Sequence, residues 1–250
     1  MKNCVKKLNK IEYVITYACT GRCIHCSEGS HESTGESINA DAAVRTLFRV
    51  AERYPIETVM TFGGEPLLHP FTVCAIHRAS YELGIKKRQI ITNGYFSKDD
   101  SDIRIVAKRI SEARVNDVLV SVDAFHAECI PVDIVQAFAL ELTALGVPVR
   151  TQPAWLVSPE HDNPYNEKTR ELLNRFGKLG ITENEGNIVF PSGRAIECLS
   201  EYFEQNDLPV DPYKEDPYDV RTLSIDPDGG VLGGNVYDSD IIDIIRSYEP

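Results

Sequence analysis

The sequence predicts an α/β protein, because short apolar runs of strand length alternate with longer segments of helical periodicity. Six strand-like runs are expected, at residues 11–16, 56–61, 89–92, 117–123, 147–156 and 187–190. Alternation at this period is typical of parallel βαβ units. Six units are too few for a closed eight-stranded barrel, and by periodicity alone they suit an open doubly wound sheet as well as a partial barrel.

Helices are predicted between these strands, and several of their ends carry recognisable signals. The segments with helical periodicity are residues 40–54, 70–83, 99–114, 132–145 and 166–179. Ser37 or Asn39 can cap the first of them, since both residue types accept hydrogen bonds from the first helical turn. Gly84 and Gly146 follow the second and fourth, as glycine commonly does where a helix ends.

The C-terminal part of the chain predicts a small extension after the α/β unit. Residues 207–219 hold three prolines among five acids and are expected to form a surface loop. Residues 222–235 predict a β-hairpin that turns at 227–230, and a short helix is expected at about 239–248. We therefore expect a barrel domain over residues 1–206 and a cluster-free hairpin-and-helix extension over residues 207–250.

Composition narrows the class of protein. The 250 residues are 42% hydrophobic and carry a formal net charge of −12, which argues against general nucleic-acid binding and against binding to anionic membranes. No apolar stretch has the length of a membrane span, and the basic N-terminus is followed by a strand-length run that contains Glu12. Seven cysteines form no disulfide pattern, so a reducing, cytoplasmic setting is expected.

Two motifs that follow the first two predicted strands carry most of the functional information. Cys19, Cys23 and Cys26 are spaced C-x₃-C-x₂-C. Three thiolates can hold three irons of a [4Fe–4S] cluster and leave the fourth iron open to a small molecule. The second motif is the turn Gly63-Gly64-Glu65-Pro66, in which the glycines allow a close backbone approach and the proline fixes the exit.

Together the two motifs resemble the radical S-adenosylmethionine (SAM) superfamily, over roughly residues 11–195. The resemblance implies a partial (β/α)₆ TIM barrel with a short C-terminal β-hairpin and helix. It also implies that SAM binds the open iron and that one electron cleaves it to methionine and a 5′-deoxyadenosyl radical, which abstracts a substrate hydrogen. The cofactors expected are therefore a [4Fe–4S] cluster and SAM, and the cofactor carries the chemistry.

The resemblance also assigns roles to individual residues. Cys19, Cys23 and Cys26 are the expected iron ligands. His25 occupies the position of an aromatic ring that lies against the cluster and the adenine. The residues expected to contact SAM or to support its site are His25, Gly63, Gly64, Glu65, Pro66, Thr92, Asn93, Ser121 and Asp123. For the Thr92-Asn93-Gly94 turn, an ordinary strand-to-helix turn is an equally good interpretation.

Catalytic residues are not fixed by the sequence, and the candidates are Asp123, His126 and Arg194. Strand alternation puts Ser121 and Asp123 on one side of the fourth strand, and His126 follows at the mouth of the barrel. Each also has a purely structural interpretation, as a cap, an ion pair or a solvated side chain. Cys129 is expected to be a buried thiol, with a hydrogen-atom donor to a substrate radical as the alternative.

The turn Pro191-Ser-Gly-Arg-Ala195 and the Asp-Gly hairpin resemble members with a C-terminal auxiliary-cluster extension of the SPASM or twitch type. The cysteines of that extension are missing here, since Cys198 is the only cysteine after Cys129. One thiolate cannot hold a second cluster. A ribosomally made peptide is the first hypothesis for the substrate, and a small molecule of cofactor biosynthesis is the alternative. Flavodoxin or ferredoxin is the expected electron donor.

A different class of protein also fits part of the sequence. Cys19, Cys23 and Cys26, with His25 or His31, would make a Cys₃His zinc site, and the chain would then be a non-catalytic scaffold or sensor. Structural zinc sites usually come as two separated pairs of ligands, whereas these lie in one loop. A scaffold would also have no need of the turn at residues 63–66.

Overall fold

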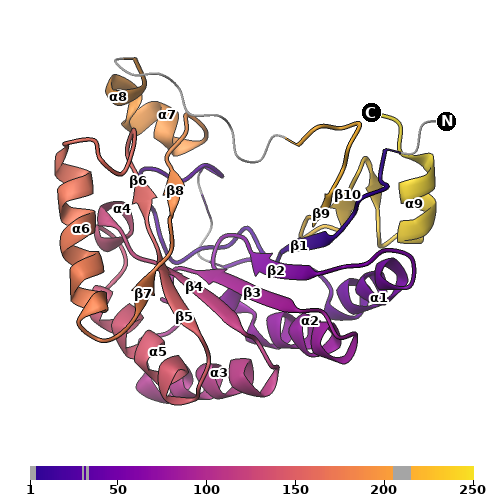
Figure 1. Ribbon diagram of the computed structural model, residues 1–250, viewed down its shortest axis with the longest axis horizontal. Helices are drawn as coiled ribbons and strands as arrows, with labels where there is room; N and C mark the ends of the chain where they lie inside the picture. Colours follow the sequence, from indigo (N-terminus) through magenta and orange to yellow (C-terminus); the bar gives the residue numbers. More distant parts are fainter. Residues whose placement is uncertain (1–3, 30, 32–33, 205–214) are drawn as a thin grey trace.

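The computed structural model describes residues 4–29, 31, 34–204 and 215–250, and its main feature is one curved parallel sheet. The strand order is β7-β5-β4-β3-β2-β1-β9, and every neighbouring pair is parallel. Figure 1 shows the sheet as an open arc with helices outside it. Among the described residues the edge strands β7 and β9 are not paired with each other, so the barrel is partial, as predicted.

The strands and helices alternate along the chain as the sequence predicts. The strands of the main sheet are β1 (Lys10–Val14), β2 (Thr58–Phe62), β3 (Lys87–Thr92), β4 (Asp117–Ser121), β5 (Val149–Gln152), β7 (Thr182–Glu183) and β9 (Thr222–Ile225). The long helices are α1 (Ala40–Ala51), α2 (Pro70–Glu82), α3 (Asp100–Glu112), α5 (Val132–Ala144) and α6 (Pro164–Gly177). Asn39 caps α1 by accepting a hydrogen bond from the Ala42 amide, so of the two predicted caps it is Asn39 that serves.

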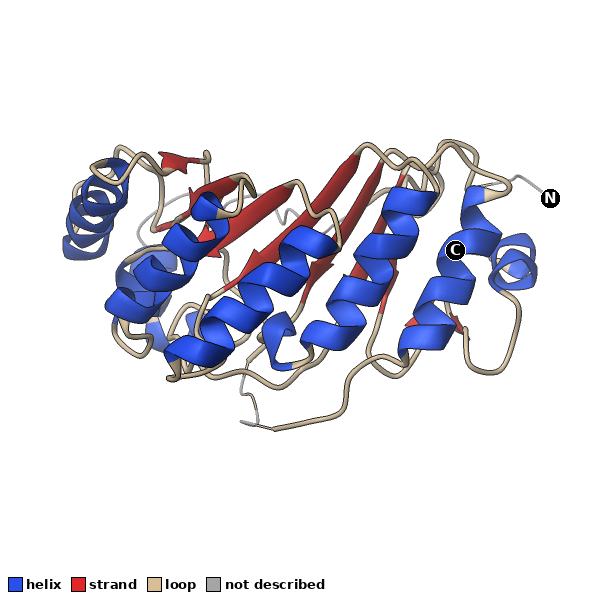
Figure 2. Ribbon diagram, turned by 90° about the horizontal axis from the view of Figure 1, so that it is seen from below, coloured by secondary structure: helices blue, strands red, loops and turns tan. Residues whose placement is uncertain are grey.

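The hydrophobic core lies between the sheet and the helices that cover its outer face (Figure 2). Ile11 and Tyr13 of β1, Val59 of β2 and Ile90 of β3 are fully buried and point into this layer. Their burial fixes the register of the parallel strands, because a shift by one residue would expose every apolar side chain. The inner face of the arc carries apolar side chains such as Phe62 and Ile91 together with polar side chains at the strand ends.

The sixth predicted strand, residues 187–190, is not part of the main sheet. The position beside β5 is taken by β7, whereas β8 (Asn187–Ile188) pairs with β6 (Ala154–Trp155) in a separate parallel pair. Pro153 explains the difference, since proline has no N–H to donate and therefore divides the predicted strand 147–156 into β5 and β6. The Pro153 carbonyl instead accepts a hydrogen bond from the Asn187 amide.

The C-terminal hairpin prediction is partly wrong. Residues 222–225 do not form one arm of a hairpin but add β9 to the main sheet, parallel to β1, with Leu223 and Ile225 fully buried. The antiparallel hairpin is the shorter pair β10 (Gly230–Val231) and β11 (Gly234–Asn235), and α9 (Ile241–Ser247) follows beside α1. Part of the predicted loop at 207–219 lies outside the described residues. The division at residue 206 stays a prediction.

The remaining short elements are a 3₁₀ helix (Pro66–Leu68), α4 (Ala124–Ala127), α7 (Arg194–Cys198) and α8 (Ser200–Glu204). In the part of the chain that the structure describes, no helix is both long enough and apolar enough to cross a lipid bilayer.

Candidate functional site

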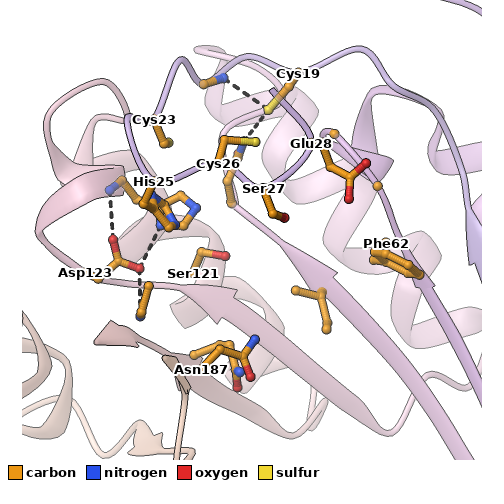
Figure 3. Close-up of a pocket in the computed structure, with 18 of the residues that line it drawn as sticks. Cys19, Cys23, His25, Cys26, Ser27, Glu28, Phe62, Ser121, Asp123 and Asn187 are labelled. Carbon is orange, nitrogen blue, oxygen red and sulfur yellow. Dashed lines mark hydrogen bonds and ion pairs between the residues drawn. The ribbon is translucent and has the colours of Figure 1, made fainter. Parts of the chain in front are cut away.

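A cavity of about 220 Å³ opens at the carboxyl ends of the parallel strands, where α/β proteins commonly bind their ligands. The predicted residues that line it are Cys19, Cys23, His25, Cys26, Gly63, Gly64, Thr92, Asn93, Ser121, Asp123 and His126. They come from four separate strand ends, and Figure 3 shows the cysteines grouped at one end of the cavity with Asp123 and Ser121 across from them. The fold therefore brings most of the predicted site together.

The three cysteines of the loop after β1 share this cavity. Gly21 lies beside two of them: a Cβ atom at Gly21 would be 3.3 Å from the Cys23 sulfur and 3.7 Å from the Cys19 sulfur. Burial raises the pKa of Cys19 to about 11 and also raises the pKa of Cys26. Without metal the two thiols therefore hold their protons, which a metal must displace on binding. Three converging thiols in a partly enclosed cavity fit a cluster with one iron left open.

The Gly63-Gly64 turn supports the cysteine loop directly. The Gly64 amide donates to the Thr16 carbonyl and the Glu65 amide to the Ala18 carbonyl, both at 2.8 Å. A Cβ atom on Gly64 would lie only 2.1 Å from the Ala18 oxygen, so no other residue fits without moving the backbone. The two glycines thus let the turn pack closely against the backbone that leads into the cysteine loop. They also line the cavity.

Glu65 and Pro66 do not line the cavity but hold the turn in place. The buried Glu65 carboxylate accepts hydrogen bonds from the Thr92 hydroxyl at 2.6 Å, the Asn93 amide at 2.8 Å and the Leu67 amide at 2.9 Å. Burial raises the pKa of Glu65 to about 7, although these three hydrogen bonds favour the carboxylate. Glu65 therefore ties the end of β2 to the end of β3. A direct contact of Glu65 or Pro66 with SAM stays a prediction.

Asn93 and Ser121 extend the site along the strand ends. The Asn93 side-chain amide donates to the Thr20 hydroxyl at 3.1 Å and points at the Cys19 sulfur at 3.6 Å. Ser121 ends β4 and projects into the cavity, as Figure 3 shows. These polar groups give the cavity hydrogen-bond donors and acceptors beside the cysteines, which a polar cofactor requires.

Asp123 and His126 form an ion pair in the wall of the cavity, with a His126 ring nitrogen within 4.8 Å of the Cys23 sulfur. Asp123 is 1% exposed and accepts hydrogen bonds from the His126 amide, the His126 Nδ1 atom at 2.8 Å and the Ala154 amide. Burial opposes the charge on Asp123, but His126 outweighs burial and lowers the pKa of Asp123; the carboxylate in turn raises the pKa of His126. Because a carboxylate only accepts, His126 carries a proton on Nδ1, and its Nε2 atom is left for other partners.

His25 stands as an aromatic ring between this pair and the cysteines. Its ring stacks on Phe125 with centroids 4.7 Å apart and meets His126 edge-on at 4.8 Å. Its Nδ1 atom is buried and has no hydrogen-bond partner among the described residues, and burial lowers the pKa of His25 to about 4. The ring is therefore neutral.

Arg194 braces the cysteine loop and is not among the residues that line the cavity, and a catalytic role for it stays a prediction. Its backbone amide donates to the Cys26 carbonyl at 2.9 Å, and its guanidinium donates to the Cys23 carbonyl at 3.3 Å and to the Arg22 carbonyl. Gly193 makes this possible, with φ at +52° and a Cβ position only 2.4 Å from the Ser27 carbonyl oxygen. The turn after β8 is thus a second support for the loop.

Several cavity residues were not found by sequence reasoning. Tyr17, Glu28, Gln152 and Asn187 also line the cavity. Glu28 lies in the same loop as the cysteines, and its nearness to Cys26 in sequence was a usable signal. Asn187 gave no signal, because its approach depends on the pairing of β8 with β6.

His31 contacts a predicted metal ligand without being one of the predicted site residues. Its Nε2 atom is 3.0 Å from the Cys26 sulfur, and its Nδ1 atom is 2.7 Å from the Tyr17 carbonyl oxygen. A carbonyl only accepts, so Nδ1 carries a proton and Nε2 faces the thiol. The sequence singled out His31 only for the alternative zinc site. Among the described residues, possible metal-ligand atoms of Cys23, His25 and His126 lie within 4.8 Å of one another. This group differs from the alternative zinc site, because it contains one cysteine and two histidines.

Comparison with solved structures shows the same fold in several enzymes. Streptococcus suis SuiB bound to the precursor peptide SuiA is similar at 15% identity with a TM-score of 0.64, and the match covers 97% of this chain and 65% of SuiB. HydG, a maturase of the [FeFe]-hydrogenase, is similar at 9% identity with a TM-score of 0.54, covering 95% of this chain and 60% of HydG. The chain thus spans about two thirds of the length of these relatives or less.

Sequence comparison gives the family. No curated protein matches the chain. The profile of the radical SAM superfamily matches residues 13–205, a range that includes the cysteine loop, the Gly-Gly-Glu-Pro turn and the strand ends that line the cavity. The chain therefore belongs to the radical SAM superfamily, whose enzymes use a [4Fe–4S] cluster and S-adenosylmethionine.

Proposed function

We propose that this enzyme modifies a peptide, with one cluster held by Cys19, Cys23 and Cys26. The observation that carries the proposal is the cavity itself, in which three thiols, the Gly63-Gly64 turn and the Asp123–His126 pair meet at the ends of parallel strands. The loop that carries the three cysteines has two supports for its backbone, the Gly63-Gly64 turn and the turn at Gly193-Arg194, and such preorganisation favours assembly of a cluster.

When bound, the cluster and SAM together supply a 5′-deoxyadenosyl radical that takes a hydrogen atom from the substrate. The chain's own residues bind and orient. Thr92, Asn93 and Ser121 offer hydroxyl and amide groups to the polar parts of SAM, beside Gly63 and Gly64. His25, whose ring is neutral and lines the cavity, is proposed to lie against the adenine. Flavodoxin or ferredoxin is the electron donor that we propose.

Asp123 and His126 are proposed to hold and move a proton at the substrate. The Asp123 carboxylate fixes His126 through Nδ1, so that Nε2 is the atom that exchanges protons with substrate groups in the cavity. The Asp123 carboxylate raises the pKa of His126, and we propose His126 as the general acid. Arg194 is proposed as a support for the cysteine loop rather than as a substrate ligand.

A peptide is proposed as the substrate for two reasons. The SuiB structure, which is similar in fold, is bound to a precursor peptide. Strand β8 also borders the cavity, and in the described part of the chain it is paired on one side only, with β6. The amides of Asn187 and Val189 donate to β6, so the intervening Ile188 N–H and C=O face away from it. An extended peptide can pair with such an edge and reach the cavity with one side chain.

The experiment is a substrate screen with the anaerobically reconstituted enzyme, SAM and dithionite. We expect peptides encoded beside the gene to increase 5′-deoxyadenosine formation and to change in mass, and the Asp123→Asn variant to lose product by roughly a hundredfold. The triple Cys19/Cys23/Cys26→Ala variant is the control for uncatalysed cleavage. Stimulation by a low-molecular-weight metabolite fraction, with none by any peptide, would instead support the small-molecule alternative.

A further inference from the structure

A fourth thiol lies against one of the three proposed iron ligands. The Cys129 sulfur is 3.3 Å from the Cys23 sulfur, although 106 residues separate them in the chain. Cys129 follows α4, and its backbone amide donates to the His126 carbonyl at 3.0 Å, so the end of this helix fixes its position. Cys129 does not line the cavity, whereas Cys23 does. Its thiol therefore faces the ligand and not the space in which a substrate would lie.

Either sulfur can donate in the metal-free structure, so iron binding by Cys23 decides which one donates in the loaded protein. The Arg22 amide donates to the Cys129 sulfur at 3.3 Å, which uses one acceptor position of that sulfur. The single Cys129 S–H then has two acceptors in reach, the Cys23 sulfur at 3.3 Å and the His126 carbonyl at 3.6 Å. An iron-bound Cys23 is a thiolate and has no proton to give, so in the loaded protein Cys129 is the donor of the S–H···S bond.

We propose that Cys129 is a positioning residue whose S–H donates a hydrogen bond to the iron-bound Cys23 sulfur and raises the reduction potential of the cluster. This inference rests on the proposed assignment of Cys23 as an iron ligand. Reduction adds negative charge that spreads over the cluster and its sulfur ligands, and a hydrogen-bond donor stabilises that charge. The cluster takes one electron from an external reductant such as dithionite, and the proton stays on Cys129 throughout.

The Cys129→Ala variant tests this role, with Cys129→Ser as the conservative variant, because serine keeps an O–H donor. Each variant is reconstituted anaerobically, its iron is counted, and its midpoint potential is measured by a dithionite titration followed by electron paramagnetic resonance. At a solution potential that reduces half of the wild-type clusters, we expect the ratio of reduced to oxidised cluster in Cys129→Ala to fall about tenfold. For one electron this corresponds to a midpoint about 59 mV more negative. Cys129→Ser should lie closer to wild type.

Cys74→Ala is the matched control, because it removes another buried thiol from α2, outside the cavity lining. It should keep the wild-type potential. A Cys129→Ala protein with full iron and an unchanged potential would overturn the proposal. If Cys129→Ala does not keep its iron, Cys129→Val decides, because valine also removes the donor: a midpoint more negative than wild type supports the hydrogen bond, and a wild-type midpoint refutes it. Iron binding by the triple Cys19/Cys23/Cys26→Ala variant would instead refute the ligand assignment.

Discussion

Gly64 offers the sharpest test of how the two sequence motifs depend on each other. In Gly64→Ala, the new Cβ would lie 2.1 Å from the Ala18 oxygen and 2.6 Å from the Ala18 carbonyl carbon, where ordinary contacts begin at 3.4 Å. The carbonyl must therefore retreat by about 1.3 Å, which breaks the hydrogen bond from the Glu65 amide. Overpacking of this kind costs about 1–3 kcal/mol, and a lost buried hydrogen bond adds about 1–3 kcal/mol.

We expect Gly64→Ala to be less stable to denaturant by about 2–6 kcal/mol and to bind less iron, because the displaced segment leads directly into Cys19. Unfolding by urea gives the first quantity, and iron analysis after reconstitution gives the second. Gly177→Ala is the control, since a Cβ there meets nothing within 4 Å and helix propensity improves. Full iron content and wild-type stability in Gly64→Ala would refute the argument that this turn supports the loop.

Three further predictions concern the supports of the site and the core. Burial lowers the pKa of His77 to about 3 from 6.5, so the stability that its neutral form contributes is complete above pH 6.5 and is lost as the pH falls below it. From this residue, the free energy of unfolding of the wild type, measured with urea, should fall by up to about 1.4 kcal/mol per pH unit below pH 6.5. His77→Leu should lack this part of the pH dependence, and parallel pH profiles of the two proteins would contradict the prediction. Glu65→Gln should lower stability by about 1–3 kcal/mol, because an NH₂ group replaces an oxygen that accepts from Thr92, Leu67 or Asn93; an unchanged melting temperature would show that the carboxylate is not needed. Arg194→Ala should lose iron to a chelator roughly tenfold faster, because the lost hydrogen bonds to the loop carbonyls stabilise the loop by about 1.4 kcal/mol. An unchanged rate of iron loss would show that Arg194 does not stabilise the loop.

Local sequence was sufficient to predict the cysteine loop and the glycine turn, because each motif is continuous in the chain. The order of strands and helices was also predictable, since apolar periodicity marks each βαβ unit. Parallel strands then bring all their carboxyl ends to one edge. This is why Thr92, Ser121 and Asp123 meet the cysteines without any long-range information in the sequence.

The rest depends on contacts between distant segments. Pro153 gave a local signal for the break between β5 and β6, but not for the partner that β6 finds in β8. Arg194 was predictable as a polar residue near the site. The direction in which its side chain points depends on the positive φ of Gly193 and on the path of the cysteine loop. The contact between Cys129 and Cys23 depends on where α4 ends, so a lone cysteine in the sequence gave no sign of it.

Iron content tests the central claim most directly. The claim is that Cys19, Cys23 and Cys26 hold one [4Fe–4S] cluster and leave one iron for SAM. After anaerobic reconstitution we expect about four iron and four sulfide per chain, a change in the electron paramagnetic resonance of the reduced cluster when SAM is added, and no cluster in the triple Cys19/Cys23/Cys26→Ala variant. Stoichiometric zinc without iron in anaerobically purified protein, or a cluster that survives in the triple variant, would contradict the claim.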